Sequence, residues 1–272
     1  MAGNLNVATI ESLDHDGRGV AHVEGKVVFI EGALPGERVS FICQRNKPKF
    51  AIARIEAVLA ASSQRVTPRC PHFGICGGCS MQHLEPGAQA AVKQRVLEDA
   101  FWHIARLKPE TILSPIIGPA WGYRRRARLT VRKVVKKGGV LVGFHEKKSS
   151  YVADMTSCAV LPAPISALLP RLRLLVGSLS ISTRLPQIEV AVGDGPPVLV
   201  LRILEPLTPA DEDLLRAFAD GSGVHLWLQP GGPDTAHPFF PIDAPWPSYR
   251  LPDYDVTLHF KPTDFTQVNH DV

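Results

Sequence analysis

Apolar and polar residues alternate in short runs over residues 4 to 60. The runs are rich in β-branched residues, and turn formers separate them, as in DHDGRG and LPGE. This pattern predicts five short strands joined by tight turns. Five strands at near-regular spacing are typical of a small closed or partly open barrel of the OB type, which often binds single-stranded nucleic acid across one face. A purely structural barrel is equally consistent with the pattern.

The pattern changes after residue 85, where apolar residues recur at helical spacing. Val92, Val96, Ala100 and Ile104 lie four apart, which predicts an amphipathic helix. From Trp121 onward strand-like runs return in RARLTVRKVV, GVLVGFHE and SYVADM, and KKGG predicts a hairpin turn between the first two. Helix-like runs follow at residues 164–179 and 207–221, and Thr208 with the acids after it predicts the start of the second. We therefore predict a fold that is mainly β and α+β, in which an OB-like barrel is followed by an antiparallel α+β domain.

Composition places the chain among ordinary globular proteins, with 45% hydrophobic and 21% charged residues. The first residues, MAGNLNVATIESL, lack the basic head and apolar run of a signal peptide. The apolar run PPVLVLRILEP is interrupted by Arg202, so no membrane span is expected. These features predict a cytoplasmic protein with no membrane contact, in a compartment that keeps thiols reduced.

Charge is unevenly distributed along the chain. Between Ala120 and Ser150 there are ten Lys or Arg residues and a single acid, Glu146. Such a run indicates a face for a polyanion, although a solvated surface is the ordinary alternative. The run RARLTVR and the arginines before it are expected to form a strand, whose side chains alternate between two faces. The residues expected to contact RNA phosphates are then Arg124, Arg126 and Arg128 on one face and Arg125 on the other.

Three of the five cysteines fall within ten positions, at Cys70, Cys76 and Cys79, and Cys158 follows much later. An odd cysteine count in a reducing compartment argues for a metal or for catalysis rather than for disulfides. Four thiolates suit either Zn²⁺ or a [4Fe–4S] cluster, and His72 or His83 could complete a zinc site in place of Cys158. The glycine-rich spacing FGICGGC slightly favours the larger iron–sulfur group. Cys43 is expected to be a buried core residue in a strand.

Four landmarks of the chain occur together in one known family: TPRCPHFGICGGCSMQHL, WGYRRRARLTVR, SCAVLPAPISALLP and DFTQVN. In this order they resemble the iron–sulfur RNA (uracil-5-)-methyltransferases, in particular the bacterial group that acts on 23S ribosomal RNA and has an N-terminal TRAM domain. The resemblance covers residues 10 to 269. It implies ribosomal RNA as partner and S-adenosylmethionine as cofactor. It also implies a [4Fe–4S] cluster on Cys70, Cys76, Cys79 and Cys158, and a cofactor contact at Gln267.

The resemblance also implies a division of the chain. The expected segments are a TRAM-like barrel (1–62), the cysteine loop (63–84), a helix that packs on a methyltransferase domain (85–108), a central RNA-binding domain (109–262) and the start of the methyltransferase domain (263–272). The family methylates carbon-5 of uracil after a cysteine thiolate attacks carbon-6. No cysteine follows Cys158, so the catalytic nucleophile is expected to be absent from this chain. No strand–GxGxxG–helix unit occurs either, so most of the S-adenosylmethionine site is also expected to be absent. Two interpretations follow: part of an RNA (uracil-5-)-methyltransferase that is inactive alone, or a stand-alone iron–sulfur or zinc RNA-binding module without an evident protein partner.

Overall fold

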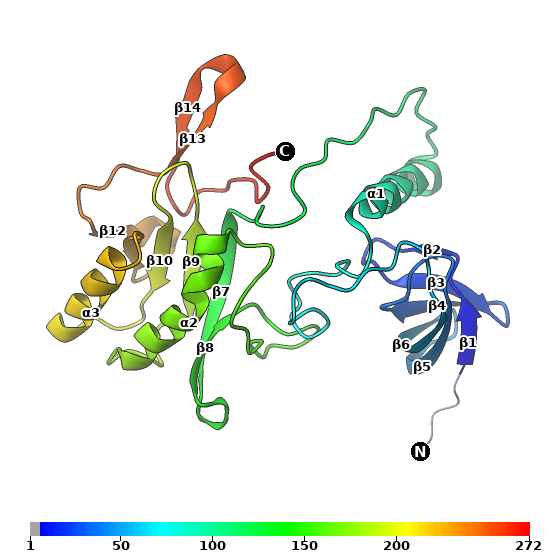
Figure 1. Ribbon diagram of the computed structural model, residues 1–272, viewed down its shortest axis with the longest axis horizontal. Helices are drawn as coiled ribbons and strands as arrows, with labels where there is room; N and C mark the ends of the chain where they lie inside the picture. Colours follow the sequence, from blue (N-terminus) through cyan, green and yellow to red (C-terminus); the bar gives the residue numbers. More distant parts are fainter. Residues whose placement is uncertain (1–5) are drawn as a thin grey trace. The chain divides into compact units, whose positions relative to one another are not determined.

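The computed structural model describes residues 6–272, and these form two compact units. One unit consists of the chain up to Phe73 together with Cys79–Ile117, and the other of Gly74–Gly78 together with Gly118–Val272. Figure 1 shows their elements in sequence colours. The predicted class, mainly β with α+β, is confirmed. The predicted boundaries near residues 62, 84, 108 and 262 stay a prediction.

A six-stranded sheet builds the first unit (blue in Figure 1). It runs in the order β1-β5-β6-β4-β3-β2. Glu11, which follows the first strand, donates its backbone N–H to the Val20 oxygen at the opposite side of the sheet, so the sheet curls around its core. The strands are β1 (Asn6–Thr9), β2 (Ser12–Leu13), β3 (Gly19–Val23), β4 (Lys26–Glu31), β5 (Arg38–Asn46) and β6 (Phe50–Ala60).

The barrel core consists of small and branched side chains that alternate with outward residues. Among the described residues of this core, Phe41 is the one buried aromatic side chain, and Ile30 and Val39 belong to the same cluster. Five strands were expected where six form. The first predicted strand divides because Ile10 donates its N–H to Glu37 while Glu11 donates to Val20, so adjacent residues pair with different parts of the sheet.

Helix α1 (Pro86–Ala100) follows the cysteine loop and continues as a short π-helix, Phe101–Ala105. Glu85 caps it by accepting the N–H of Ala88. A small apolar cluster of Leu13, Leu34 and Leu84, with Met81, Ala88 and Val92 against it, joins the start of this helix to the barrel. Beyond that point the helix is little covered: none of its residues is buried, and Ile104 is 84% exposed.

The second unit contains a six-stranded sheet in the order β12-β11-β10-β9-β7-β8. Neighbours pair antiparallel except β10 and β11. Helices α2 (Ala163–Ser178) and α3 (Pro209–Asp220) pack on it and contact each other (Figure 1). The strands are β7 (Arg126–Val134), β8 (Gly139–Gly143), β9 (Gln187–Ala191), β10 (Val198–Arg202), β11 (His225–Gln229) and β12 (His237–Phe240), and a separate hairpin is formed by β13 (Ser248–Leu251) and β14 (Val256–His259).

Local sequence signals explain two of these elements. Lys136, Lys137 and Gly138 make the predicted turn between β7 and β8, and Gly138 adopts the left-handed conformation, with φ 81°, that glycine tolerates best. Helix α3 begins with a capping box. The Asp211 N–H donates to the Thr208 hydroxyl oxygen, and the Thr208 N–H donates to the Asp211 carboxylate.

Asp211 also accepts hydrogen bonds from Ser180, at 2.8 Å from its N–H and 2.5 Å from its hydroxyl. Burial alone would raise the pKa of Asp211, but the hydrogen bonds from Ser180 and Thr208 outweigh it and lower the pKa to about 2. The carboxylate thus joins the start of α3 to the loop that follows α2.

Two expectations were wrong. The run SYVADM forms no strand, and only Val152 in it pairs, with His145. Cys43 is exposed rather than buried, because the pairing of β5 with β6 shifts register between Cys43 and Arg45, where the strand has passed the end of the core. Among the described residues, no helix has the length and apolar content needed to cross a membrane.

Candidate metal centre and nucleic-acid interface

The base of the cysteine loop is a narrow neck of backbone hydrogen bonds. Arg65 and Leu84 form an antiparallel bridge, and Val66 donates its N–H to His83 at 3.0 Å. Glu85 donates its N–H to Gln64 at 2.9 Å. Residues 65 and 84 therefore close a loop of which both arms belong to the first unit.

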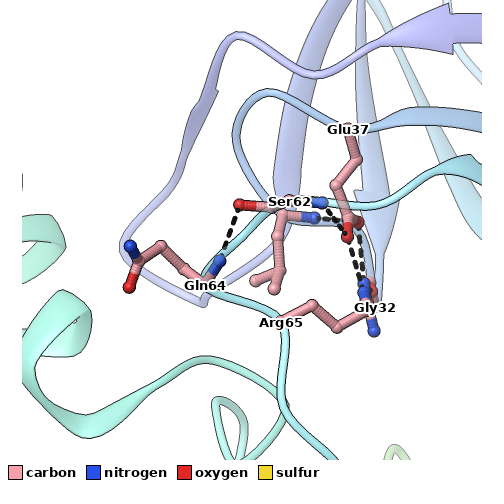
Figure 2. Close-up of polar contacts among 6 residues, drawn as sticks. Gly32, Glu37, Ser62, Gln64 and Arg65 are labelled. Carbon is pink, nitrogen blue, oxygen red and sulfur yellow. Dashed lines mark hydrogen bonds and ion pairs between the residues drawn. The ribbon is translucent and has the colours of Figure 1, made fainter.

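A buried ion pair ties this neck to the barrel (Figure 2). The side chain of Glu37 is 0% exposed, and Arg65 donates to its two oxygens from Nε at 2.6 Å and from Nη2 at 2.7 Å. The same carboxylate accepts the N–H groups of Leu34 and Ser62, and Arg65 also donates to the Gly32 oxygen at 2.7 Å. Both carboxylate oxygens are therefore fully engaged, as a buried charge requires.

Burial alone would raise the pKa of Glu37. The hydrogen bonds from the Arg65 side chain and from the Leu34 and Ser62 backbone outweigh that effect, so the pKa lies below its usual value. Glu37 therefore stays ionised, and the neck of the cysteine loop is held by a charge-assisted pair.

The tip of the cysteine loop makes a second set of backbone contacts, within the second unit. Cys76 bridges Glu146, Gly77 donates its N–H to His145 at 2.8 Å, and Lys147 donates its N–H to Ile75 at 2.8 Å. A Cβ on Gly77 would lie 3.1 Å from the His145 oxygen, which explains the glycine at that position.

The four predicted ligands are distributed over both units: Cys70 and Cys79 in the first, Cys76 and Cys158 in the second. Cys70, Cys76 and Cys158 are buried, and Cys79 is half-buried. The Cys158 N–H is fixed by the Ser166 hydroxyl at 2.8 Å, near the start of α2. Within residues 6–272 no three His, Cys, Asp or Glu side chains are gathered closely enough to hold a metal ion. The donor types suit ligation of a [4Fe–4S] cluster by four thiolates, or of zinc with His72 or His83 in place of Cys158.

The arginine strand, defined as Arg124–Arg128, runs through the start of β7. Its backbone pairs with a segment much later in the chain, residues 262–270, hereafter the 262–270 segment. Arg124 bridges Asn269, and Arg125 donates its N–H to the Val268 oxygen at 2.9 Å.

The four arginine side chains have different surroundings. Arg126 is half-buried and donates from Nη1 to the Pro262 oxygen, and burial lowers its pKa. Arg125 donates from Nη1 to the Gly193 oxygen at 3.3 Å and lies 3.5 Å from an Asp194 oxygen. The Arg128 side chain is 71% exposed and pairs with Glu189 at 3.0 Å.

Arg124 is the exception among the inner arginines. Its guanidinium lies 5.4 Å from the centre of the Phe144 ring. Its Nε, and the Oδ1 of its bridge partner Asn269, are buried without a hydrogen-bond partner among residues 6–272. An N–H donor and a carbonyl acceptor in this condition are costly unless water or a ligand satisfies them.

The turn region between β7 and β8 adds four exposed cations, namely Arg132, Lys133, Lys136 and Lys137. Gln267, the predicted cofactor contact, is exposed on the 262–270 segment, and its neighbour Phe265 is 85% exposed. Sequence reasoning missed the Glu37–Arg65 pair and the contacts of the 262–270 segment, because no local pattern marks partners so distant in the chain.

Comparison with known proteins agrees with the sequence resemblance. Residues 7–55 match the TRAM domain family. A protein of Aromatoleum aromaticum named 23S rRNA (uracil(1939)-C(5))-methyltransferase RlmD is 61% identical over 98% of this chain and 62% of its own length. Proteins of the same name from Ralstonia nicotianae and Bordetella pertussis are each 60% identical, over 100% and 98% of this chain. The chain thus spans about three fifths of the length of these relatives.

A solved structure has a similar fold. It is the tRNA (uracil-54, C5)-methyltransferase of Pyrococcus abyssi in complex with S-adenosyl-L-homocysteine, with a TM-score of 0.64 and 20% identity. The match covers 97% of this chain and 61% of that one. At this identity the likeness concerns the fold.

Proposed function

We propose that this chain serves the S-adenosylmethionine-dependent methylation of a uridine at carbon-5 in 23S ribosomal RNA. The observation that carries the proposal is the identity of about 60% over nearly all of the chain to relatives with one name, uracil-C5 methyltransferases of 23S rRNA. The TRAM match and the exposed cations of the second unit are compatible with an RNA substrate.

Deleting the gene in its host tests this proposal. Nucleoside mass spectrometry of 23S rRNA from the deletion strain should show the loss of 5-methyluridine at the position equivalent to uracil 1939, and the gene in trans should restore it. Unchanged 5-methyluridine at that position would refute the proposal. It would instead favour the alternative, an iron–sulfur or zinc RNA-binding module without catalysis.

Within that function, the chain's own part is to bind RNA and present residues to the reaction. Arg128, largely exposed, is the member of the arginine strand best placed to donate to RNA, and Arg124 is the second proposed contact. The exposed cations around the β7–β8 turn extend that surface. Gln267 is proposed as a contact to S-adenosylmethionine, and its exposure leaves its amide accessible. Since Cys70, Cys76, Cys79 and Cys158 are assigned to ligation below, none of them serves as the nucleophile in this proposal.

We also propose that Cys70, Cys76, Cys79 and Cys158 hold a [4Fe–4S] cluster. Support comes from the spacing, from the burial of three of the four thiols, and from the hydrogen-bonded neck and tip that fix the loop backbone. When bound, such a cluster would supply covalent cross-links between segments of the chain, and no redox step is assigned to it.

Metal analysis after anaerobic purification tests the cluster. We expect a brown protein with about four iron and four sulfide per chain. Cys76→Ser should lower both, whereas Cys43→Ser, at the exposed thiol not assigned as a ligand, should leave both unchanged. Stoichiometric zinc without iron would refute the cluster and leave the zinc alternative.

A further inference from the structure

We infer that Arg125 and Arg126 are positioning residues, which fasten the 262–270 segment to the rest of the second unit at two points and hold Gln267 between them. Arg124 and Arg128 then remain as the nucleic-acid contacts of the arginine strand. The inference rests on the proposed function for what the segment is used for, but its attachment can be tested without RNA or cofactor.

The first point of attachment is Arg126. It lies on the same strand face as Arg124 and Arg128, so alternation alone would make all three equivalent. Its Nη1 donates instead to the oxygen of Pro262, and Pro262 is buried. A half-buried guanidinium that already donates to a buried carbonyl is poorly placed to neutralise a phosphate, and its lowered pKa reflects the same burial.

The second point is Arg125, six residues further along the segment. Its N–H donates to the Val268 oxygen, and the bridge between Arg124 and Asn269 continues the pairing by one residue. The Arg125 side chain points to the turn after β9, where it meets the Gly193 oxygen and Asp194.

Asp194 makes this second point a junction. It accepts the Arg250 N–H at 2.8 Å and lies 3.8 Å from Nε2 of His270. The close packing here is visible at Gly193, where a Cβ would lie only 2.4 Å from the Ser248 oxygen. The β13–β14 hairpin and the end of the 262–270 segment are therefore fixed to the same turn.

Between the two points the segment faces solvent. Phe265 is 85% exposed and Gln267 is exposed. A stretch held at both ends and exposed in the middle presents its side chains in a limited set of orientations, which lowers the entropy cost of engaging a ligand. This is the sense in which Arg125 and Arg126 position Gln267.

Limited proteolysis of the 272-residue chain tests the inference. Chymotrypsin cleavage after Phe265, followed by mass spectrometry, reports release of the segment. Arg126→Ala should speed this cleavage by about tenfold or more, the effect expected for losing a hydrogen bond from a charged donor. Arg126→Lys should restore part of the protection. Arg128→Ala, two residues along the same strand face, should leave the cleavage rate unchanged.

Two further readouts separate positioning from other roles. Amide exchange in α2 and the barrel should be unchanged in Arg126→Ala, since general unfolding would raise exchange everywhere. The salt dependence of RNA binding should keep its slope in Arg126→Ala. Wild-type cleavage after Phe265 in Arg126→Ala would overturn the inference. None of these measurements uses methyl transfer, so the test of the segment's attachment is independent of whether the proposed function is correct.

Discussion

Each unit of the molecule uses arginines to fasten a distant segment, but the two arrangements differ in their acceptors. In the first unit Arg65 meets a carboxylate that is fully shielded from solvent and already bonded to two backbone N–H groups. In the second, Arg125 and Arg126 reach backbone oxygens, and the carboxylate nearby, Asp194, is 45% exposed.

This difference determines how each arrangement should respond to change. Removing one member of a buried ion pair leaves a charge or its partners without compensation, so the loss is large. Removing one of several hydrogen bonds to backbone carbonyls costs less, because the remaining contacts still hold the segment. We therefore expect the neck of the cysteine loop to fail as a unit, and the 262–270 segment to loosen step by step.

The largest effect is expected for Glu37→Ala. Arg65, 25% exposed, would lose its carboxylate, and the Leu34 and Ser62 N–H groups would lose their acceptor. Such losses cost about 3–5 kcal/mol for a buried pair. Amide exchange of barrel peptides should rise accordingly, with Glu56→Ala as control, because Glu56 pairs with Arg54 on the exposed surface of the same barrel and is worth at most about 1 kcal/mol. Equal effects of the two substitutions would show that the buried pair is not special.

Acid should separate the two regions with a smaller effect. The folded-state pKa of Glu37 lies below 4.5, so its contribution is fully present above pH 4.5 and is lost as the pH falls through the folded value. At the Arg126 end of the 262–270 segment the acceptor is the carbonyl oxygen of Pro262, which does not titrate.

Exchange measured between pH 6 and pH 3, corrected for its intrinsic pH dependence, should therefore rise at the neck in the wild-type chain. In Glu37→Gln that additional rise should be absent. An identical pH response in wild type and Glu37→Gln would contradict the assignment of this transition to Glu37.

The sequence predicted the elements whose cause is local. Thr208 and Asp211 lie three residues apart and form the predicted start of α3, and Gly138 closes the predicted turn after β7. The strands of the barrel follow from alternation, apart from the division at Ile10 and the exposed Cys43, where pairing partners rather than pattern decide.

The roles of charged residues were less accessible from sequence. Glu37 and Arg65 are 28 residues apart, and Arg126 and Pro262 are 136 apart. A run of basic residues predicts an anionic partner for the run as a whole. It cannot show that one guanidinium is already used by a carbonyl far along the chain, and for this reason the arginine strand looked uniform.

The smallest effect is expected at Arg128, and it tests whether the arginine strand does have two kinds of member. Arg128 is 71% exposed, so Arg128→Ala should leave the fold and the 262–270 segment intact. If it contacts one phosphate, the slope of log K against log salt for an RNA fragment should become shallower by about 0.7, because one fewer counterion is released on binding. Arg126→Ala should show the wild-type slope. Filter binding at several salt concentrations measures the slope for both variants. A shallower slope for Arg126→Ala, together with the wild-type slope for Arg128→Ala, would reverse the assignment of the two residues.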